Sequence, residues 1–314
     1  MIDGLLRRGQ TPARPGPGPM PEPLLRALDL TIARRVEGML PGDHRSSLLG
    51  RGSELAQIRP YEPVEDDVRQ IDWNVTARTG TPHVRIHLAE RALVTWLVLD
   101  TSPSMTFGTA ERRKADVAEG ASLAVGYAAT RRGNRLGLVT FGDEHPRVLP
   151  ARQGRAGLLG LLLALRKEDA AKTGRRESGS ATSVGDALQR VGTLARQRSY
   201  IVVVSDFRGP RDWRRPLLAL GGRHHVVAVE IRDAREQELP NFGQLRLVDP
   251  ETGRQLRVDS SSDRLRSRFA AAAAQERREV AAEITSAGAR HVVLKTDGDW
   301  LRDLTGFLRH AGAQ

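Results

Sequence analysis

Apolar residues from position 93 onward alternate between short continuous runs and longer periodic stretches. The run over 93–99 is apolar at every position but Thr95, which is typical of a parallel strand covered on both faces. Over 112–131 the apolar residues recur at helical spacing and predict an amphipathic helix. The same patterns predict strands at 136–141, 147–149, 201–204, 226–231 and 292–295, and helices at 157–166, 184–196, 216–220, 264–287 and 299–308. Strands and helices in alternation predict a doubly wound α/β fold with a mostly parallel sheet.

Two segments depart from this alternation. Residues 244–248 and 255–258 flank Asp249-Pro250-Glu251-Thr252-Gly253, a turn-forming sequence that predicts a β-hairpin insertion. Ahead of position 90 the texture changes to short β-prone pieces and many turn residues, with apolar and polar residues alternating over 84–88. We therefore expect a small strand-rich region in front of the α/β domain.

The N-terminal 23 residues contain six prolines and four glycines, a composition that cannot bury a core. They predict a disordered tail, with a proline-rich ligand for a partner domain as the alternative. Residues 24–40 carry apolar side chains at helical spacing, and Pro41-Gly42 would end that helix. The predicted organisation is thus a tail over 1–23, a region of one helix and short strands over 24–90, and an α/β domain over 91–314.

Composition narrows the class of protein. Hydrophobic residues make up 39% and charged residues 28%, which is typical of a globular protein. The chain has no cysteine, so disulfides, thiolate metal sites and thiol catalysis are excluded. No apolar run approaches the roughly 20 residues of a membrane span, and prolines follow the N-terminal arginines too soon for a signal peptide. We therefore expect a cytoplasmic location.

The chain is strongly basic, with a formal net charge of +11. Only four of its 49 basic residues are lysines, and this arginine bias accompanies heavy alanine and glycine use, as a GC-rich genome produces. Aromatic residues are 4% of the chain and are not interleaved with arginines as base-stacking platforms require. The composition therefore argues against a nucleic acid and leaves an acidic membrane surface or an acidic protein as partners for the charge.

Polar residues follow two of the predicted parallel strands. Asp100-Thr101-Ser102-Pro103-Ser104 follows the first strand, and Ser205-Asp206 follows the strand over 201–204. Because ligands bind at the carboxyl ends of such strands, these residues are candidates for one site, together with Thr182 before a helix. Oxygen ligands of low total charge suit Mg²⁺ or Mn²⁺. The candidate metal ligands are Asp100, Ser102, Ser104, Thr182 and Asp206.

Other functions for these residues stay open. Each of them could cap a helix or hold a turn, and the chain would then be a structural scaffold without metal. Ser183 rivals Thr182 as the hydroxyl ligand. A metal-dependent phosphohydrolase is the enzymatic alternative, but Ser102 stands where haloacid-dehalogenase-type enzymes carry an acid/base aspartate. Neither a nucleophile-elbow motif nor a P-loop is present, so no enzymatic activity is expected.

The series Asp100-x-Ser102-x-Ser104, Thr182 and Asp206 resembles the metal-ion-dependent adhesion site of von Willebrand factor A-type domains. The stretch ahead of it resembles the signature of the bacterial family called domain of unknown function 58, through Gly50-Arg51-Gly52-Ser53-Glu54, Arg59-Pro60-Tyr61-Glu62-Pro63, Asp66-Asp67-Val68-Arg69-Gln70-Ile71-Asp72-Trp73 and Thr76-Ala77-Arg78. One departure is Val64-Glu65, where members of that family commonly carry a glycine.

The resemblance implies a role for each candidate ligand. Asp100, Ser102 and Ser104 would be the core ligands, Thr182 a direct ligand in the ligand-bound state, and Asp206 a direct or water-mediated one. A carboxylate of a partner protein would complete the metal shell. The resemblance further implies an adaptor or co-chaperone that works with a MoxR-type AAA+ ATPase, or with that ATPase's client, in the assembly of protein complexes.

The signature region has its own two interpretations. Its charged residues could form an ion-pair network that ties this region to the α/β domain, with Trp73 as a buried anchor, or they could form a second binding site. The residues concerned are Asp66, Asp67, Arg69, Asp72 and Arg78.

Overall fold

The computed structural model describes residues 49–50, 54–63, 66–88, 93–109, 112–131, 134–143, 146–171, 183–248 and 254–311. These residues form two compact units, one within Pro41–Ala92 and one from Leu93 onward, and each has its own sheet. The tail predicted over 1–23 and the helix predicted over 24–40 lie outside the described residues.

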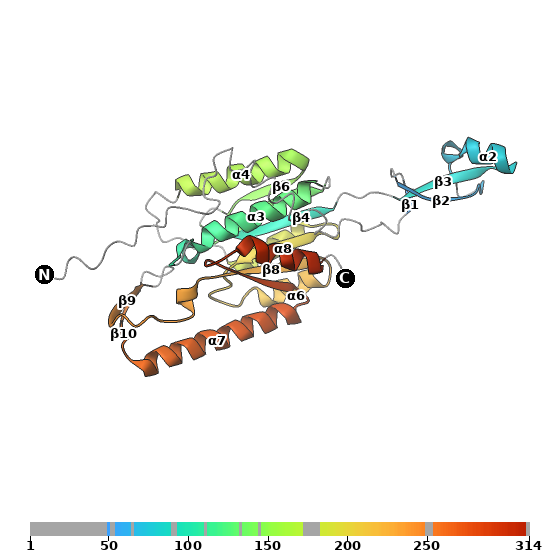
Figure 1. Cartoon of the computed structure of the whole chain (residues 1–314). Coiled ribbons are helices and arrows are strands. Elements are labelled where there is room, and N and C mark those ends of the chain that lie inside the picture. The colour runs from blue at the N-terminus through green and yellow to red at the C-terminus, as the bar shows by residue number, and fades with distance from the viewer. Residues whose placement is uncertain are drawn as a thin grey trace. The chain divides into compact units, whose positions relative to one another are not determined.

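Six strands form the central sheet of the larger unit (Figure 1). They are β4 (Val94–Asp100), β5 (Arg135–Phe141), β6 (Val148–Gln153), β7 (Tyr200–Ser205), β8 (His225–Arg232) and β11 (Arg290–Lys295). Their order is β11-β8-β7-β4-β5-β6, and every neighbouring pair is parallel except β5 with β6. The sheet grows outward in both directions from β4, so the order reverses between β4 and β7. This topology confirms the predicted doubly wound, mostly parallel fold.

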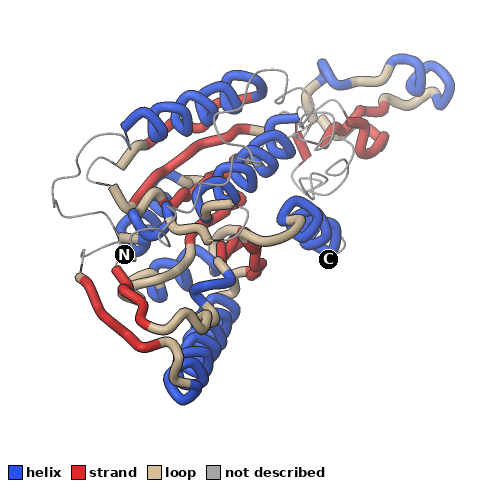
Figure 2. Tube along the Cα trace, turned by 60° about the vertical axis from the view of Figure 1, so that its left-hand side comes forward, coloured by secondary structure: helices blue, strands red, loops and turns tan. Residues whose placement is uncertain are grey.

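Helices cover both faces of this sheet (Figures 1 and 2). One core contains residues of α3 (Lys114–Arg131), α4 (Gly154–Ala171) and α8 (Trp300–Ala311), and the other contains residues of α5 (Val184–Leu194), α6 (Arg214–Gly221) and α7 (Asp263–Ser286). Alternate residues of β4 enter opposite cores: Leu97 and Leu99 belong to the first, Trp96 and Val98 to the second. Burial on both faces is the reason for the continuous apolar runs in the sequence.

The connection between β8 and α7 contains the predicted hairpin. Strands β9 (Gln244–Val248) and β10 (Gln255–Asp259) pair antiparallel, with Leu247 opposite Leu256. The turn predicted at 249–253 lies outside the described residues. Helix α4 is longer than its apolar pattern predicted, because the good helix formers over 166–171 continue it past the last core residue.

The smaller unit is a three-stranded antiparallel sheet with a short helix. Its strands are β1 (Leu49–Gly50), β2 (Glu54–Pro60) and β3 (His83–Leu88), in the order β1-β3-β2, and between β2 and β3 lie the 3-10 helix η1 (Val68–Gln70) and α2 (Trp73–Thr79). The strand-rich character predicted for this region is confirmed.

Charged residues of the signature region pair within the smaller unit. Asp72 accepts hydrogen bonds from the first turn of α2 and forms an ion pair with Arg85 at 2.6 Å, while Asp66 pairs with Arg59 at 2.8 Å. Trp73 is not part of the core of the smaller unit, where it is 68% exposed, and its role as an anchor to the α/β domain stays a prediction. Asp72 fixes the start of α2, and Trp73 then falls on the outer side of the first turn, whereas Val84 is fully buried.

Candidate functional site

Asp100 ends β4 at the point where the strand order reverses, and its side chain is buried. Its Oδ1 accepts a hydrogen bond from the backbone N–H of Ser102 at 2.9 Å. Its Oδ2 accepts one from the hydroxyl of Ser205, the last residue of β7, at 2.5 Å. The Ser102 hydroxyl also hydrogen-bonds Asp100, and since a carboxylate has about four lone-pair sites, at least one is left for a further ligand.

The surroundings of Asp100 disfavour its negative charge. Burial and then the nearby charge of Asp206 raise the pKa of Asp100 to about 7, against the opposing effect of hydrogen bonds from Ser102 and Ser205. In the described part of the chain no cationic side chain forms an ion pair with Asp100. A cation bound here would favour the ionised carboxylate.

Ser102 and Ser104 bring two hydroxyl groups together beside Asp100, with 3.0 Å between their Oγ atoms. Ser102 precedes the 3-10 helix η2 (Pro103–Thr106), but its side chain makes no capping hydrogen bond there. Neighbouring ligands of an octahedral Mg²⁺ at ~2.1 Å are separated by roughly 3.0 Å. The spacing of the two hydroxyls therefore suits adjacent positions in a magnesium shell.

The loop that carries these serines is held tightly against the loop after β5. Thr101 donates from both its backbone N–H and its hydroxyl to the carbonyl oxygen of Phe141, at 2.9 and 2.8 Å. Gly142 has φ +83°, and a Cβ there would lie 2.6 Å from the nitrogen of Ser102. Only glycine permits this approach, which fixes the position of the Ser102 backbone.

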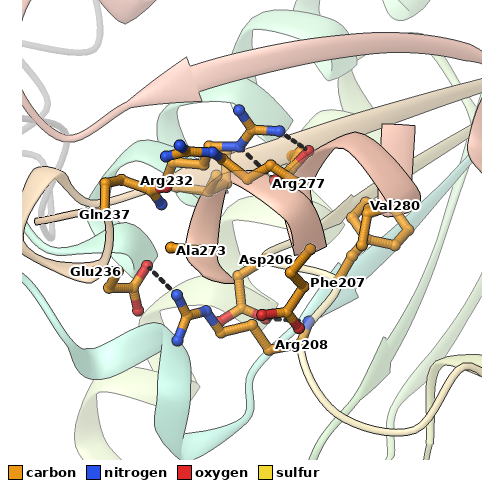
Figure 3. A pocket seen from close by; sticks show the side chains of 12 residues that line it. Asp206, Phe207, Arg208, Arg232, Glu236, Gln237, Ala273, Arg277 and Val280 are labelled. Carbon is orange, nitrogen blue, oxygen red and sulfur yellow. Dashed lines mark hydrogen bonds and ion pairs between the residues drawn. The ribbon is translucent and has the colours of Figure 1, made fainter. Parts of the chain in front are cut away.

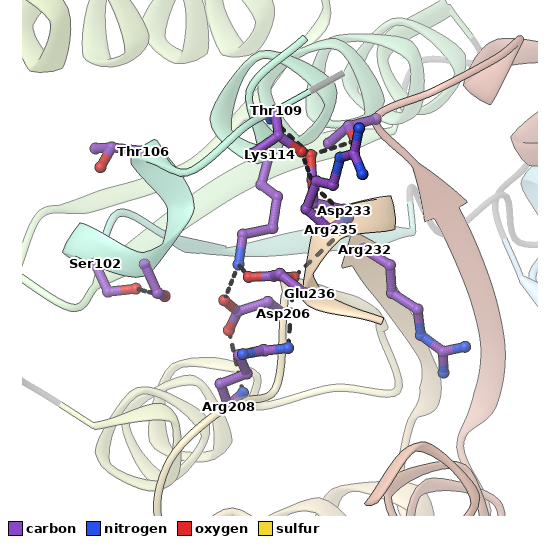
Figure 4. Close-up of polar contacts among 12 residues, drawn as sticks. Ser102, Thr106, Thr109, Lys114, Asp206, Arg208, Arg232, Asp233, Arg235 and Glu236 are labelled. Atoms are coloured by element: carbon purple, nitrogen blue, oxygen red, sulfur yellow. Dashed lines mark hydrogen bonds and ion pairs between the residues drawn. The ribbon is translucent and has the colours of Figure 1, made fainter. Parts of the chain in front are cut away.

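Asp206 lies at the same edge of the sheet, where it meets a buried lysine (Figure 4). The ammonium of Lys114, the first residue of α3, donates to Oδ2 of Asp206 at 2.6 Å and to Oε1 of Glu236 at 2.7 Å. Oδ1 of Asp206 accepts from the backbone N–H of Arg208 at 3.1 Å. The ammonium of Lys114 thus already balances the charge of Asp206, which favours a water-mediated contact with any cation held by Asp100.

Lys114 and Glu236 were not among the residues that the sequence singled out. One signal could have found Lys114: a lysine in the first turn of a helix opposes the helix dipole, so it needs anionic partners. Glu236 lies on η3 (Ala234–Glu236), a segment with no strand pattern to mark it as part of this edge.

Two hydroxyl residues, Thr182 and Ser183, precede α5 in the sequence. Thr182 lies outside the described residues, so its role stays a prediction. Ser183 caps α5: its hydroxyl accepts from the backbone N–H of Asp186 at 3.1 Å, and Asp186 reaches back to the N–H of Ser183. Ser183, which the sequence offered as a rival to Thr182 for the metal, is thus the N-cap of α5.

Asp233 joins three loops at the same edge of the sheet. It follows β8, is fully buried, and accepts hydrogen bonds from Thr109 at 2.5 and 3.0 Å and from the hydroxyl of Thr296 after β11 at 2.8 Å. Burial opposes its charge, but these hydrogen bonds together hold the pKa of Asp233 below its usual value. Asp233 thereby holds Thr109, which follows η2 and precedes the helix that begins with Lys114.

A small cavity adjoins Asp206 between η3 and α7 (Figure 3). Its volume is about 30 Å³, and its lining includes Arg208, Arg232, Arg277 and Glu236. A space of this size holds one or two water molecules and no organic substrate. Asp100, Ser102 and Ser104 do not line this cavity, so it adjoins the candidate site only at Asp206.

The donor set of Asp100, Ser102 and Ser104 fits a hard divalent cation, because a carboxylate lies beside two hydroxyls that are 3.0 Å apart. Within the described ranges, no group of three or more His, Asp or Glu side chains is placed to hold a metal ion. The same residues include no helix long and apolar enough to cross a membrane.

The sheet order and its polar edge define a doubly wound α/β domain with a candidate cation site. A family model described as "Protein of unknown function DUF58" matches residues 57–279. Uncharacterized protein Rv1480 of Mycobacterium tuberculosis is 44% identical over 294 residues, which cover 92% of this chain and 90% of the relative. The chain belongs to this family, as the motifs between positions 50 and 78 predicted.

More distant similarities extend to a second mycobacterial protein and to solved structures. Uncharacterized protein MAV169 of Mycobacterium avium is 41% identical over 163 residues, 51% of this chain and 92% of the relative. BatB from Bacteroides thetaiotaomicron is 14% identical with a TM-score of 0.46, over 70% of this chain and 98% of that one. The SpRpn10 VWA domain is 16% identical with a TM-score of 0.38, over 69% and 95%. These scores lie below 0.5, so the fold class rests on the sheet order itself.

Proposed function

We propose that this chain is a protein-binding module that holds Mg²⁺ or Mn²⁺ at Asp100, Ser102 and Ser104. The observation that carries the proposal is the meeting of a buried carboxylate with two hydroxyls 3.0 Å apart, at the switch point of the sheet. Thr182 would add a hydroxyl, and Asp206 would contact the cation through water.

The charge of such a site favours an acidic partner. One directly bound carboxylate leaves a divalent cation with excess positive charge and with positions that water fills. An aspartate or glutamate from another protein supplies an anionic oxygen ligand, which a hard cation prefers to water. The net charge of +11 would also steer an acidic partner toward the chain, an effect that salt weakens.

The partner that family resemblance suggests is a MoxR-type AAA+ ATPase or its client. The chain would then act as an adaptor or co-chaperone in the assembly of protein complexes, without an enzymatic activity of its own. This choice of partner rests on the resemblance alone.

A second candidate function is a structural scaffold that needs no metal. The observation that favours it is the ion pair between Lys114 and Asp206, because the ammonium already neutralises one of the two carboxylates of the site. The remaining polar residues would then form hydrogen bonds that stabilise the loops at the sheet edge, and they would bind no metal.

A binding experiment separates the two functions. The full chain is immobilised, and binding of the MoxR-type ATPase from the same organism is measured with Mg²⁺ and with EDTA. The proposal predicts binding that EDTA abolishes and that Asp100→Ala and Ser102→Ala weaken at least tenfold. Ser183→Ala is the matched control, since the hydroxyl of this serine caps α5. Binding that is equal in EDTA would refute metal-dependent recognition.

A further inference from the structure

Lys114 is fully buried, and it reaches the candidate site from the start of α3. Its ammonium lies between Asp206 and Glu236 and also 5.9 Å from the ring centre of Phe107 (Figure 4). These contacts join three segments: the start of α3, the loop after β7, and η3.

Two physical effects oppose a lysine at this position. Burial removes the ammonium from water, and the helix dipole places positive partial charge at the N-terminus of α3. Two short ion pairs, at 2.6 and 2.7 Å, offset these costs. The two carboxylates therefore keep the buried ammonium in its charged form, and this charge lies directly against Asp206.

The consequence for Asp206 is that a cation is already bound to it. Its Oδ2 contacts the ammonium, and its Oδ1 accepts from the N–H of Arg208. A metal ion at a remaining lone pair of Asp206 would be repelled by the positive charge of Lys114. Glu236 stabilises the ammonium of Lys114 in this position, because its Oε1 forms the second ion pair with it. Its Oε2 lies 3.6 Å from the guanidinium of Arg208.

We propose that Lys114 is an internal cation that competes with the metal for Asp206 and so keeps the affinity of the site low. Through this competition the metal is held by a single carboxylate of this chain, Asp100, and takes its second carboxylate from the partner. This inference rests on the proposed function, and it adds a positioning residue that regulates the same site.

Variants of Lys114 and Glu236 separate competition from a simple change of charge. Lys114, Asp206 and Glu236 together carry a formal charge of −1, and Lys114→Met combined with Glu236→Gln leaves Asp206 alone, again at −1. The double variant therefore frees Asp206 without changing the net charge. Glu236→Gln alone makes the cluster neutral and leaves Lys114 with Asp206 as its sole carboxylate.

The test is calorimetric titration of the full chain with Mg²⁺, with the midpoint of thermal unfolding as a second readout and as a check on folding. The double variant should bind Mg²⁺ at least tenfold more tightly than the parent, and Glu236→Gln at least threefold more weakly. Adding Asp206→Asn to the double variant should abolish the gain. An affinity of the double variant equal to or below that of the parent would overturn the inference.

The outcomes also distinguish this inference from the proposed function. One outcome is that the double variant binds Mg²⁺ through Asp100 while the parent does not bind it. That result would support the role of Lys114 and would refute metal-dependent partner binding by the parent protein. If neither protein binds Mg²⁺, Lys114 is not what limits the site, and the inference is wrong. Should the double variant fail to fold, unaltered affinity in Glu236→Gln would refute the inference.

Discussion

Ser205 donates its hydroxyl proton to Oδ2 of Asp100, with 2.5 Å between the two oxygens, across the adjacent ends of β7 and β4. The same hydroxyl oxygen accepts from the backbone N–H of Phe207 at 3.0 Å, where the chain turns with φ +52°. Ser205 thus fixes both the carboxylate of Asp100 and the turn that carries Asp206. The two loops of the candidate site are joined by one buried hydroxyl.

Ser205→Ala should lower the free energy of unfolding by about 1–3 kcal/mol, because Asp100 and the N–H of Phe207 each lose a buried partner. It should also weaken Mg²⁺ binding, since Asp100 would then be less well oriented. Chemical denaturation and calorimetry measure the two effects. Ser122→Ala is the control, because the Ser122 hydroxyl is equally buried and has no hydrogen-bond partner in the described structure. Equal losses in both variants would contradict this account of Ser205.

The raised pKa of Asp100 predicts a pH dependence in metal-free solution. A carboxyl group whose pKa rises from 3.8 to about 7 on folding binds its proton more tightly in the native state. Its contribution to stability is therefore complete below about pH 4 and is lost as the pH rises through 7.

Thermal unfolding in EDTA between pH 4 and 7.5 tests this dependence. The Asp100→Asn variant, whose amide does not titrate, should lack this loss of stability, so its difference from the parent should grow in its favour as the pH rises. A difference that stays constant over this range would contradict the assignment. With Mg²⁺ present the parent should regain stability above pH 7, because the cation favours the ionised carboxylate.

Gly142→Ala tests the close approach of the two loops. The new Cβ would lie 2.6 Å from the nitrogen of Ser102, so the loop that carries Ser102 and Ser104 must move. The matched control is Gly288→Ala, at a similar φ of +73° but with no atom within 4 Å of the new Cβ.

The control should cost about 1–2 kcal/mol from backbone strain alone. Gly142→Ala should cost more than that and should weaken Mg²⁺ binding at least tenfold, whereas Gly288→Ala should leave Mg²⁺ affinity unchanged. Denaturation and calorimetry measure both quantities. Equal Mg²⁺ affinity in the two variants would show that the position of Ser102 does not matter to the site.

The sheet and the placement of Asp100 could be predicted because they depend on local patterns. A strand buried on both faces is apolar throughout, and the residue after it falls at the carboxyl edge whatever the rest of the chain does. Burial of β4 on both faces, with Asp100 as its last residue, follows this rule.

The ion pairs of the site could not be predicted in the same way. Lys114 and Asp206 are 92 residues apart, and which carboxylate an ammonium meets depends on how α3 packs against the sheet. The exposure of Trp73 could not be predicted for a different reason. A lone aromatic residue in a short helix has no periodic pattern around it to indicate which side faces the core.

The most direct test of the proposed metal site is the effect of Mg²⁺ on thermal unfolding of the parent and of Asp100→Ala. At ten times the dissociation constant, a bound cation adds ~1.4 kcal/mol to the stability of the folded state, which raises the melting temperature by a few degrees. The account predicts this rise in the parent and no rise in Asp100→Ala. An equal response of the two proteins, or no response in the parent, would contradict it.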